Sequence, residues 1–230
     1  MRGETIVVVV MTSLASSCSR SSFHPAETYG PEAAAPKAAH IRSVAPGDAP
    51  ADLDKSRVVI SVVKDRDTAN PVIGRFSLRD GAVSLGSPGS ARLSVDLDSV
   101  DSSIPVRNER LRNIFFETSA LGWDTAEIVV PTLGADVVRA LGDKRHVDAT
   151  KLQGTLKVHG HTAPIAMVVD ARYADDGRLS VRTTAPVEVK ISDLGLTDNL
   201  HRLSSICMHD SIDDVVKVDV ALEFTPPAHD

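Results

Sequence analysis

The chain contains few aromatic residues, few cysteines and no long apolar run. Aromatic residues make up 3% of its 230 residues, and its two cysteines are Cys18 and Cys207. The core must therefore be filled by Val, Leu, Ile and Ala side chains. Because no run of about eighteen apolar residues occurs, the sequence argues against a transmembrane helix. The formal net charge of -6 and the pI near 5.7 argue against a nucleic-acid-binding surface.

Several catalytic and metal-binding motifs are also missing. The sequence has no glycine-rich phosphate loop, no His-Glu-x-x-His zinc motif and no nucleophile elbow around a serine. Asp96, Asp98 and Asp101 follow a strand-like spacing, without the glycine and glutamate of a calcium-binding loop. These absences argue against a hydrolase and against a calcium-binding loop. We assign the protein no catalytic residue, no metal ligand and no cofactor.

The first eighteen residues have the pattern of a bacterial export signal. A start that includes Arg2 precedes the apolar run Thr5–Met11, and small residues lead to Cys18. Cys18 after Leu14-Ala15-Ser16-Ser17 resembles a lipoprotein cleavage box, in which the cysteine is lipidated and becomes the mature N-terminus. The alternatives are an ordinary secretory signal with an incidental cysteine, or a misassigned start. We therefore predict export to the periplasm or cell envelope, with Cys18 as the candidate membrane anchor.

Residues 19–54 are rich in alanine, proline and serine. Such a composition buries too little apolar surface to offset the entropy lost on ordering, so it predicts a flexible tether. A tether directly after a candidate lipid anchor is a coherent arrangement. The folded domain is then expected to span residues 55–226.

From Arg57 onward, apolar and polar residues alternate with a period of two in about eight segments. The longest segment is Leu179–Ile191, which reads as one strand. Since each strand has one polar and one apolar face, the apolar faces must be buried together. A single antiparallel β-barrel of about eight strands does this and leaves room for side chains or one small ligand. A two-sheet sandwich fits the alternation equally well.

One segment, Ser102–Glu117, reads clearly as a helix. Asn108 is a good N-cap residue if the helix begins there. The side chains that then share one face of the helix are those of Leu111, Ile114 and Phe115. This face either closes one end of the core or borders a ligand cavity.

Six short motifs occur in an order that resembles the YceI-like family of lipocalin-like, polyisoprenoid-binding proteins. They are Gly74-Arg75-Phe76 followed by Asp80-Gly81, Val95–Val100, Arg107–Asn113 followed by Phe115-Phe116, Leu152–Leu156, Gly160–Pro164 and Ser192–Leu196. The resemblance covers roughly residues 57–224. It implies an extended antiparallel barrel, an export signal, no catalysis, and an apolar channel that holds an isoprenoid or another long-chain lipid.

We expect this channel to be lined mainly by apolar side chains near the helical segment. They are Phe76, Leu78, Leu93, Val95, Leu111, Phe115 and Phe116. Arg107 and Arg110 are expected at its mouth, because guanidinium groups suit a phosphate or carboxylate head group. The partners are thus a long-chain lipid and a membrane, with a homodimer left open.

Two other functions are compatible with the sequence. His201, Cys207 and His209 lie within nine residues, and their nitrogen and sulfur donors suit a metal or a haem. A plain loop with one thiol is the alternative for this segment. The second function is that of a structural envelope module whose barrel is filled by its own side chains.

Overall fold

The computed structural model describes residues 48–120 and 122–226. The predicted export signal, Cys18 and residues 19–47 of the tether lie outside this range. Residues 48–54 were expected in the tether, but the structure includes them in the folded domain. Asp48–Pro50 form strand β1, which pairs with Leu78–Ser84, strand β4.

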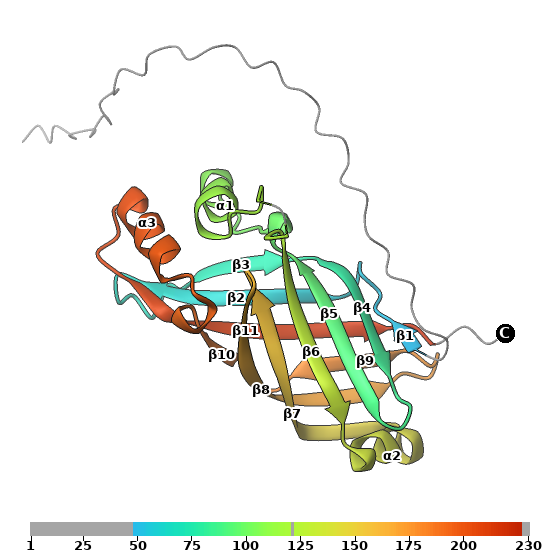
Figure 1. Cartoon of the computed structure of the whole chain (residues 1–230). Coiled ribbons are helices and arrows are strands. Elements are labelled where there is room, and N and C mark those ends of the chain that lie inside the picture. Colours follow the sequence, from blue (N-terminus) through green and yellow to red (C-terminus); the bar gives the residue numbers. More distant parts are fainter. Residues whose placement is uncertain (1–47, 121, 227–230) are drawn as a thin grey trace, which may run out of the picture. The chain divides into compact units, whose positions relative to one another are not determined.

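The described residues form one curled antiparallel sheet of eleven strands, which confirms the predicted fold class (Figure 1). The strand order is β1-β4-β5-β6-β7-β8-β9-β11-β2-β3, and β10 pairs with β11. The other strands are β2 Arg57–Lys64, β3 Val72–Phe76, β5 Gly89–Asp96, β6 Thr125–Leu133, β7 His146–Val158, β8 His161–Tyr173, β9 Leu179–Thr183, β10 Val187–Lys190 and β11 Ile212–Phe224. This exceeds the expected eight strands because short strands extend the sheet and one long strand is divided.

The sheet curls so that β1 and the residues after it, which pair with β4, also hydrogen-bond to the end of β11. Ala51 forms a bridge with Phe224. The amide of Asp52 donates to the carbonyl of Glu223 at 2.7 Å, and the amide of Thr225 donates to the carbonyl of Pro50 at 2.9 Å. These bonds satisfy backbone groups that a free sheet edge would expose.

The segment Leu179–Ile191, predicted as one strand, is divided into β9 and β10. Pro186 lies between them, and proline has no N–H to donate to a ladder. Both pieces still pair with β11, β9 with its last residues and β10 with its middle. The alternation of faces was therefore predicted correctly, but the continuity of the strand was not.

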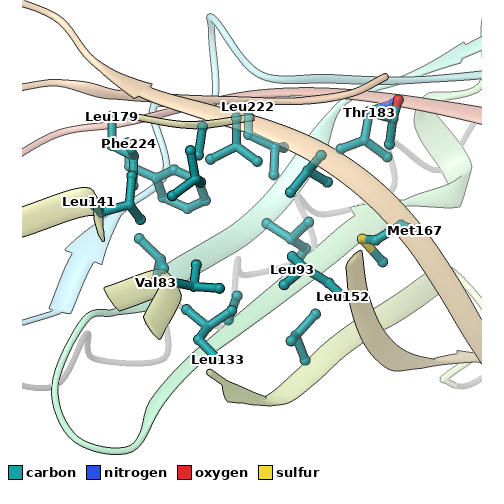
Figure 2. Close-up of a pocket in the computed structure, with 18 of the residues that line it drawn as sticks. Val83, Leu93, Leu133, Leu141, Leu152, Met167, Leu179, Thr183, Leu222 and Phe224 are labelled. Carbon is teal, nitrogen blue, oxygen red and sulfur yellow. The ribbon is translucent and has the colours of Figure 1, made fainter. Parts of the chain in front are cut away.

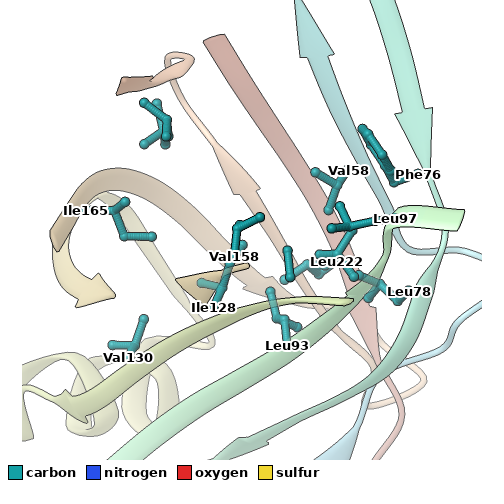
Figure 3. Packing of buried hydrophobic residues seen from close by; sticks show 14 of the residues in the cluster. Val58, Phe76, Leu78, Leu93, Leu97, Ile128, Val130, Val158, Ile165 and Leu222 are labelled. Atoms are coloured by element: carbon teal, nitrogen blue, oxygen red, sulfur yellow. The ribbon is translucent and has the colours of Figure 1, made fainter. Parts of the chain in front are cut away.

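The inward faces of the strands pack into one apolar core. In β5 and β6, buried Leu93, Val95 and Ile128 alternate with more exposed polar neighbours, as the period of two predicts. Figure 3 shows Leu93 and Ile128 in one cluster with Val58 of β2, Val158 of β7 and Ile165 of β8. The interior is mainly aliphatic, as the composition requires.

Within residues 48–120 and 122–226, three α-helices lie at the ends of the sheet, where the sequence predicted one helical segment (Figure 1). They are α1 Pro105–Arg110, α2 Ala135–Lys144 and α3 Thr197–Cys207. Short turns of helix are η1 Leu97–Ser99, η2 Leu111–Phe115 and η3 Ser192–Leu194. In Figure 1, α1 and α3 lie beyond one end of the strands, and α2 lies at the opposite end.

The predicted helix begins earlier than Asn108. Pro105 occupies its first turn, where the missing N–H costs nothing. Asn108 lies inside the helix, and its Oδ1 accepts hydrogen bonds from the amide and hydroxyl of Ser102, at 2.7 and 2.6 Å. Its side chain therefore organises the preceding loop and does not cap the helix.

Candidate functional site: an apolar channel through the barrel

The barrel encloses an apolar cavity at its α2 end, which we call the α2-side cavity. Its volume is about 90 Å³. Figure 2 shows that Leu133, Leu141, Leu179, Leu222 and Phe224 approach it from different elements. All its lining side chains are apolar except Thr183; the others are Val83, Leu85, Ala91, Leu93, Ile128, Val130, Val137, Val147, Leu152, Met167, Val169, Ala171, Val181 and Val220.

A second apolar cavity lies toward η2 and η3, and we call it the cap-side cavity. Its volume is about 120 Å³. Its lining side chains are all apolar and come from strands, from η2 and from the segment around η3. They are Val58, Ile60, Phe76, Val95, Leu97, Phe115, Phe116, Ala126, Ile128, Leu156, Val158, Ile165, Met167, Val187, Val189, Ile191, Leu194, Leu196, Val216, Val218 and Val220.

The two cavities share three lining residues, Ile128, Met167 and Val220. The two cavities therefore adjoin at these three side chains, and we call the pair together the channel. An apolar cavity of about 150 Å³ accommodates a molecule the size of benzene. A long-chain lipid would need the lining side chains to move apart, and Met167 at the junction has the flexible side chain that permits this.

The cap-side cavity contains four of the residues predicted from the sequence, namely Phe76, Val95, Phe115 and Phe116. The helical face predicted from the sequence includes Phe115 and not the adjacent Phe116, but both phenylalanines line the cavity. The reason is a π-helical turn, in which the amide of Phe116 donates to the carbonyl of Leu111 five residues earlier at 2.8 Å. This wider turn places two adjacent rings over the same cavity.

Three other predicted apolar residues have different positions. Leu93 lines the α2-side cavity. Leu78 is buried in the core and Leu111 packs against that core half-buried, but neither lines either cavity. Sequence alternation predicted their burial, although it could not predict which buried side chains border empty space.

The two predicted head-group arginines, Arg107 and Arg110, are half-buried on α1. Neither lines either cavity. Arg110 Nη1 lies 3.4 Å from the sulfur of Cys207 on α3, so this arginine links the two helices. Contact with a charged head group stays a prediction for both residues.

The segment Leu200–His209, predicted as a loop, is mostly helix α3. Leu196, Leu200, Leu203 and Cys207 recur at helical spacing, which is the signal that sequence reading missed. The His209 ring pairs with Asp65 at 2.8 Å, and His201 is exposed. In the part of the chain that the structure describes, no three His, Cys, Asp or Glu side chains come together as a metal site.

Polar contacts hold η2 and α3 together over the cap-side cavity. Asn199 donates to the carbonyl of Phe115 at 2.8 Å, and Arg202 pairs with Glu117 at 3.1 Å. The His159 ring stacks on Trp123 and hydrogen-bonds the carbonyl of Phe116. The turn η2 and the residues just after it, which we call the cap, are thus fixed to the turn after β7 as well as to α3.

Arg79 braces the adjoining rim of the barrel. Its guanidinium bonds Asp96 at 2.7 Å and Asp124 at 2.9 Å. Burial alone would lower the pKa of Arg79, but the hydrogen bond to Asp124 and the charges of both carboxylates raise it. The guanidinium therefore stays charged and keeps the residues before η1 and β6 together.

A protein-family model identifies relatives of this chain. The YceI-like domain model matches residues 51–224. The chain belongs to the YceI-like family. This YceI-like domain is similar to a polyisoprenoid-binding domain from Saccharophagus degradans, implicated in plant cell wall breakdown. The two are 25% identical with a TM-score of 0.66, and the match covers 79% of this chain and 99% of that one.

BcnA from Burkholderia cenocepacia has the same fold. It is 19% identical, with a TM-score of 0.54, over 76% of this chain and 99% of its own. No curated protein sequence matches the chain. Among the residues that the structure describes, no helix is long and apolar enough to cross a membrane.

Proposed function

We propose that this protein binds a polyisoprenoid or another long-chain lipid inside its barrel, without catalysis, in the bacterial cell envelope. The observation that carries the proposal is the channel formed by the two adjoining cavities, whose lining contains one polar side chain, Thr183. Burying a hydrocarbon chain there gains about 0.8 kcal/mol for each CH₂ group. The lining offers no charged group that would orient a reaction.

The polyisoprenoid-binding domain from Saccharophagus degradans supports this choice of ligand. A family member with that ligand and this chain share a fold along nearly the full length of the relative. The structural alternative, a barrel filled by its own side chains, is less well supported because unfilled volume remains on both sides of Met167.

The cell-envelope location is supported by the sequence pattern before Cys18, which lies outside the described residues. Cys18→Ser is expected to move the protein from the membrane fraction to the aqueous fraction of its host. Wild-type protein already in the aqueous fraction after export would contradict the anchor, but would leave the lipid-binding proposal intact.

A bulky substitution at the junction tests the proposed function. Met167 lies at the junction of the two cavities, whereas the adjacent Ala166 is exposed on the other face of β8. Met167→Trp is expected to reduce geranylgeraniol affinity at least about tenfold, or 1.4 kcal/mol. Ala166→Trp, which adds the same ring outside the barrel, is the matched control.

Lipid titration followed by native mass spectrometry measures the effect. The expected result is a lipid adduct on wild type and on Ala166→Trp, but a much weaker one on Met167→Trp. Equal lipid binding by all three proteins would place the ligand outside the channel. A metal adduct without any lipid on protein from the native host would favour the metal-binding alternative.

A further inference from the structure

Strands β6 and β7 are paired over only part of their length. β6 has 9 residues and β7 has 13, but their ladder comprises three pairs, from Glu127–Lys157 to Val129–Thr155. Beyond Val129, β6 continues to Leu133 without a partner residue on β7. The sheet is therefore split at this point, on the side where α2 connects the two strands.

The sequence contains physical reasons for the split. Pro131 lies in β6 just beyond the last pair and has no N–H to donate. On β7, the register with β8 shifts between Val147 and Thr150, and Ala149 in this bulge has a φ of 47°. Its amide donates to Asp170 at 2.8 Å. A bulge bends its strand, and this one lies in the part of β7 that has no partner on β6.

A surface depression of about 460 Å³ occupies the split, and we call it the α2 vestibule. Its polar lining includes Thr132, Asp136, Asp148, Thr150, Lys151 and Gln153. Three half-buried aliphatic residues, Val137, Val147 and Leu152, line both the vestibule and the α2-side cavity. These side chains alone are common to both linings, so they separate outside from inside.

We propose that lipid enters and leaves the channel sideways between β6 and β7 beneath α2, and that the vestibule holds an uncharged, hydrogen-bonding head group. This inference rests on the proposed function and adds the route of passage and the class of head group. Movement of three aliphatic side chains, and of the single helix that carries Val137, opens the route. The hydrocarbon tail then lies in the α2-side cavity and extends past Met167.

The charges of the vestibule favour a neutral head group. Its lining carries two carboxylates, Asp136 and Asp148, and one ammonium group, Lys151. Asp148 is already paired with Arg172 at 3.8 Å, and Lys151 offsets Asp136, so a phosphate would meet no net positive charge that could hold it there. Hydroxyl and amide groups from Thr132, Thr150 and Gln153 can instead exchange hydrogen bonds with an alcohol, amide or carbonyl.

A reversible cross-link tests the route. In full-length protein with Cys18→Ser and Cys207→Ser, the pair Asp136→Cys and Gln153→Cys places two thiols on the vestibule lining. A cleavable bis-maleimide that contains a disulfide then bridges α2 to β7. The control pair, Val106→Cys and Ile206→Cys, bridges the exposed positions of α1 and α3 at the other end. Exchange of bound geranylgeraniol is measured before and after reduction of the linker.

We expect the vestibule bridge to slow exchange at least about tenfold, reduction to restore it, and the control bridge to leave it unchanged. Slowing by the control bridge alone, or by neither bridge, would overturn the lateral route while lipid binding itself stands. A protein that binds no lipid before cross-linking would overturn the proposed function and this inference together.

A comparison of two ligands tests the class of head group that the vestibule holds. Geranylgeraniol and geranylgeranyl phosphate share a tail, so their affinities differ only through the head. Wild type is expected to bind the alcohol several-fold more tightly than the phosphate, and Asp136→Asn with Asp148→Asn to narrow this difference. Tighter binding of the phosphate by wild type would overturn the assignment of a neutral head group.

Discussion

The two ends of the barrel are closed in different ways. Phe76, Phe115 and Phe116 close the cap end, with ring centroids of Phe116 5.7 Å from Phe76 and 4.8 Å from Phe115. Hydrogen bonds and an ion pair fix that cap to α3 and to the turn after β7. The other end has one helix, α2, whose buried Leu141 and half-buried Val137 and Val138 lie over strands that have parted. Regions with few buried contacts open at low free-energy cost. The cap end, which has more fixed contacts, is therefore less suited to the passage of a lipid.

Phe116→Ala should give the largest effect. Its ring is buried and contacts two other aromatic rings. The substitution is expected to lower the free energy of unfolding by about 3–5 kcal/mol. Chemical denaturation measures this, with Val137→Ala at the α2 end as the half-buried comparison and a smaller expected loss. A larger loss at Val137 would reverse the contrast between the ends.

Gly154→Ala tests the last point at which β6 and β7 approach. A Cβ at this position would lie 2.6 Å from the carbonyl oxygen of Val129, which is closer than real contacts allow. The strands must shift, and we expect a loss of about 1–3 kcal/mol in the free energy of unfolding. Faster lipid exchange should accompany it, since the shift widens the split. Unchanged stability would mean that the strands do not approach this closely.

Gly142→Ala should have a smaller effect of opposite sign. Gly142 lies inside α2, and a Cβ there would meet no atom within 4 Å. The added methyl group is expected to stabilise the helix by about 0.5–1 kcal/mol. A thermal melt checks the stability, and the lipid exchange rate should fall modestly because α2 opens less often. An unchanged exchange rate in the stabilised protein would argue that α2 does not control passage.

Arg107→Ala and Arg110→Ala should have the smallest effect. Neither residue lines the channel, so geranylgeraniol affinity and stability should change by less than about 0.5 kcal/mol. Titration with geranylgeranyl phosphate tests the original prediction that these residues meet a charged head group. A large and selective loss for the phosphate would place a head-group site at the cap end.

Local patterns predicted much of the fold. The two-residue alternation identified the buried faces of β5, β6 and β11, because side-chain direction in a strand depends only on position along it. The helix that contains Leu111 was predicted from its apolar spacing. Two other apolar patterns, from Val137 to Leu141 in α2 and from Leu196 to Cys207 at and within α3, carried the same signal but were overlooked among strands.

The candidate site was less predictable than the fold. Phe76, Val95, Phe115 and Phe116 line the cap-side cavity and Leu93 lines the α2-side cavity, but their contact with a ligand stays a prediction. Val137, Val147 and Leu152 were not predicted as site residues. Their neighbours in the sequence do not distinguish a residue that lines two cavities from an ordinary core residue. The π-helical turn that brings both phenylalanines inward also leaves no local sequence pattern.

By itself, the sequence determined an all-β domain with an aliphatic interior, because alternation and composition act residue by residue. Only the tertiary structure decided where that interior stays unfilled. The volume on either side of Met167 depends on how strands distant in the sequence curl around it, and the split between β6 and β7 involves a proline in one strand and a bulge in the other. Cavities and unpaired strand segments are properties of the assembled barrel, and no single segment of the sequence determines them.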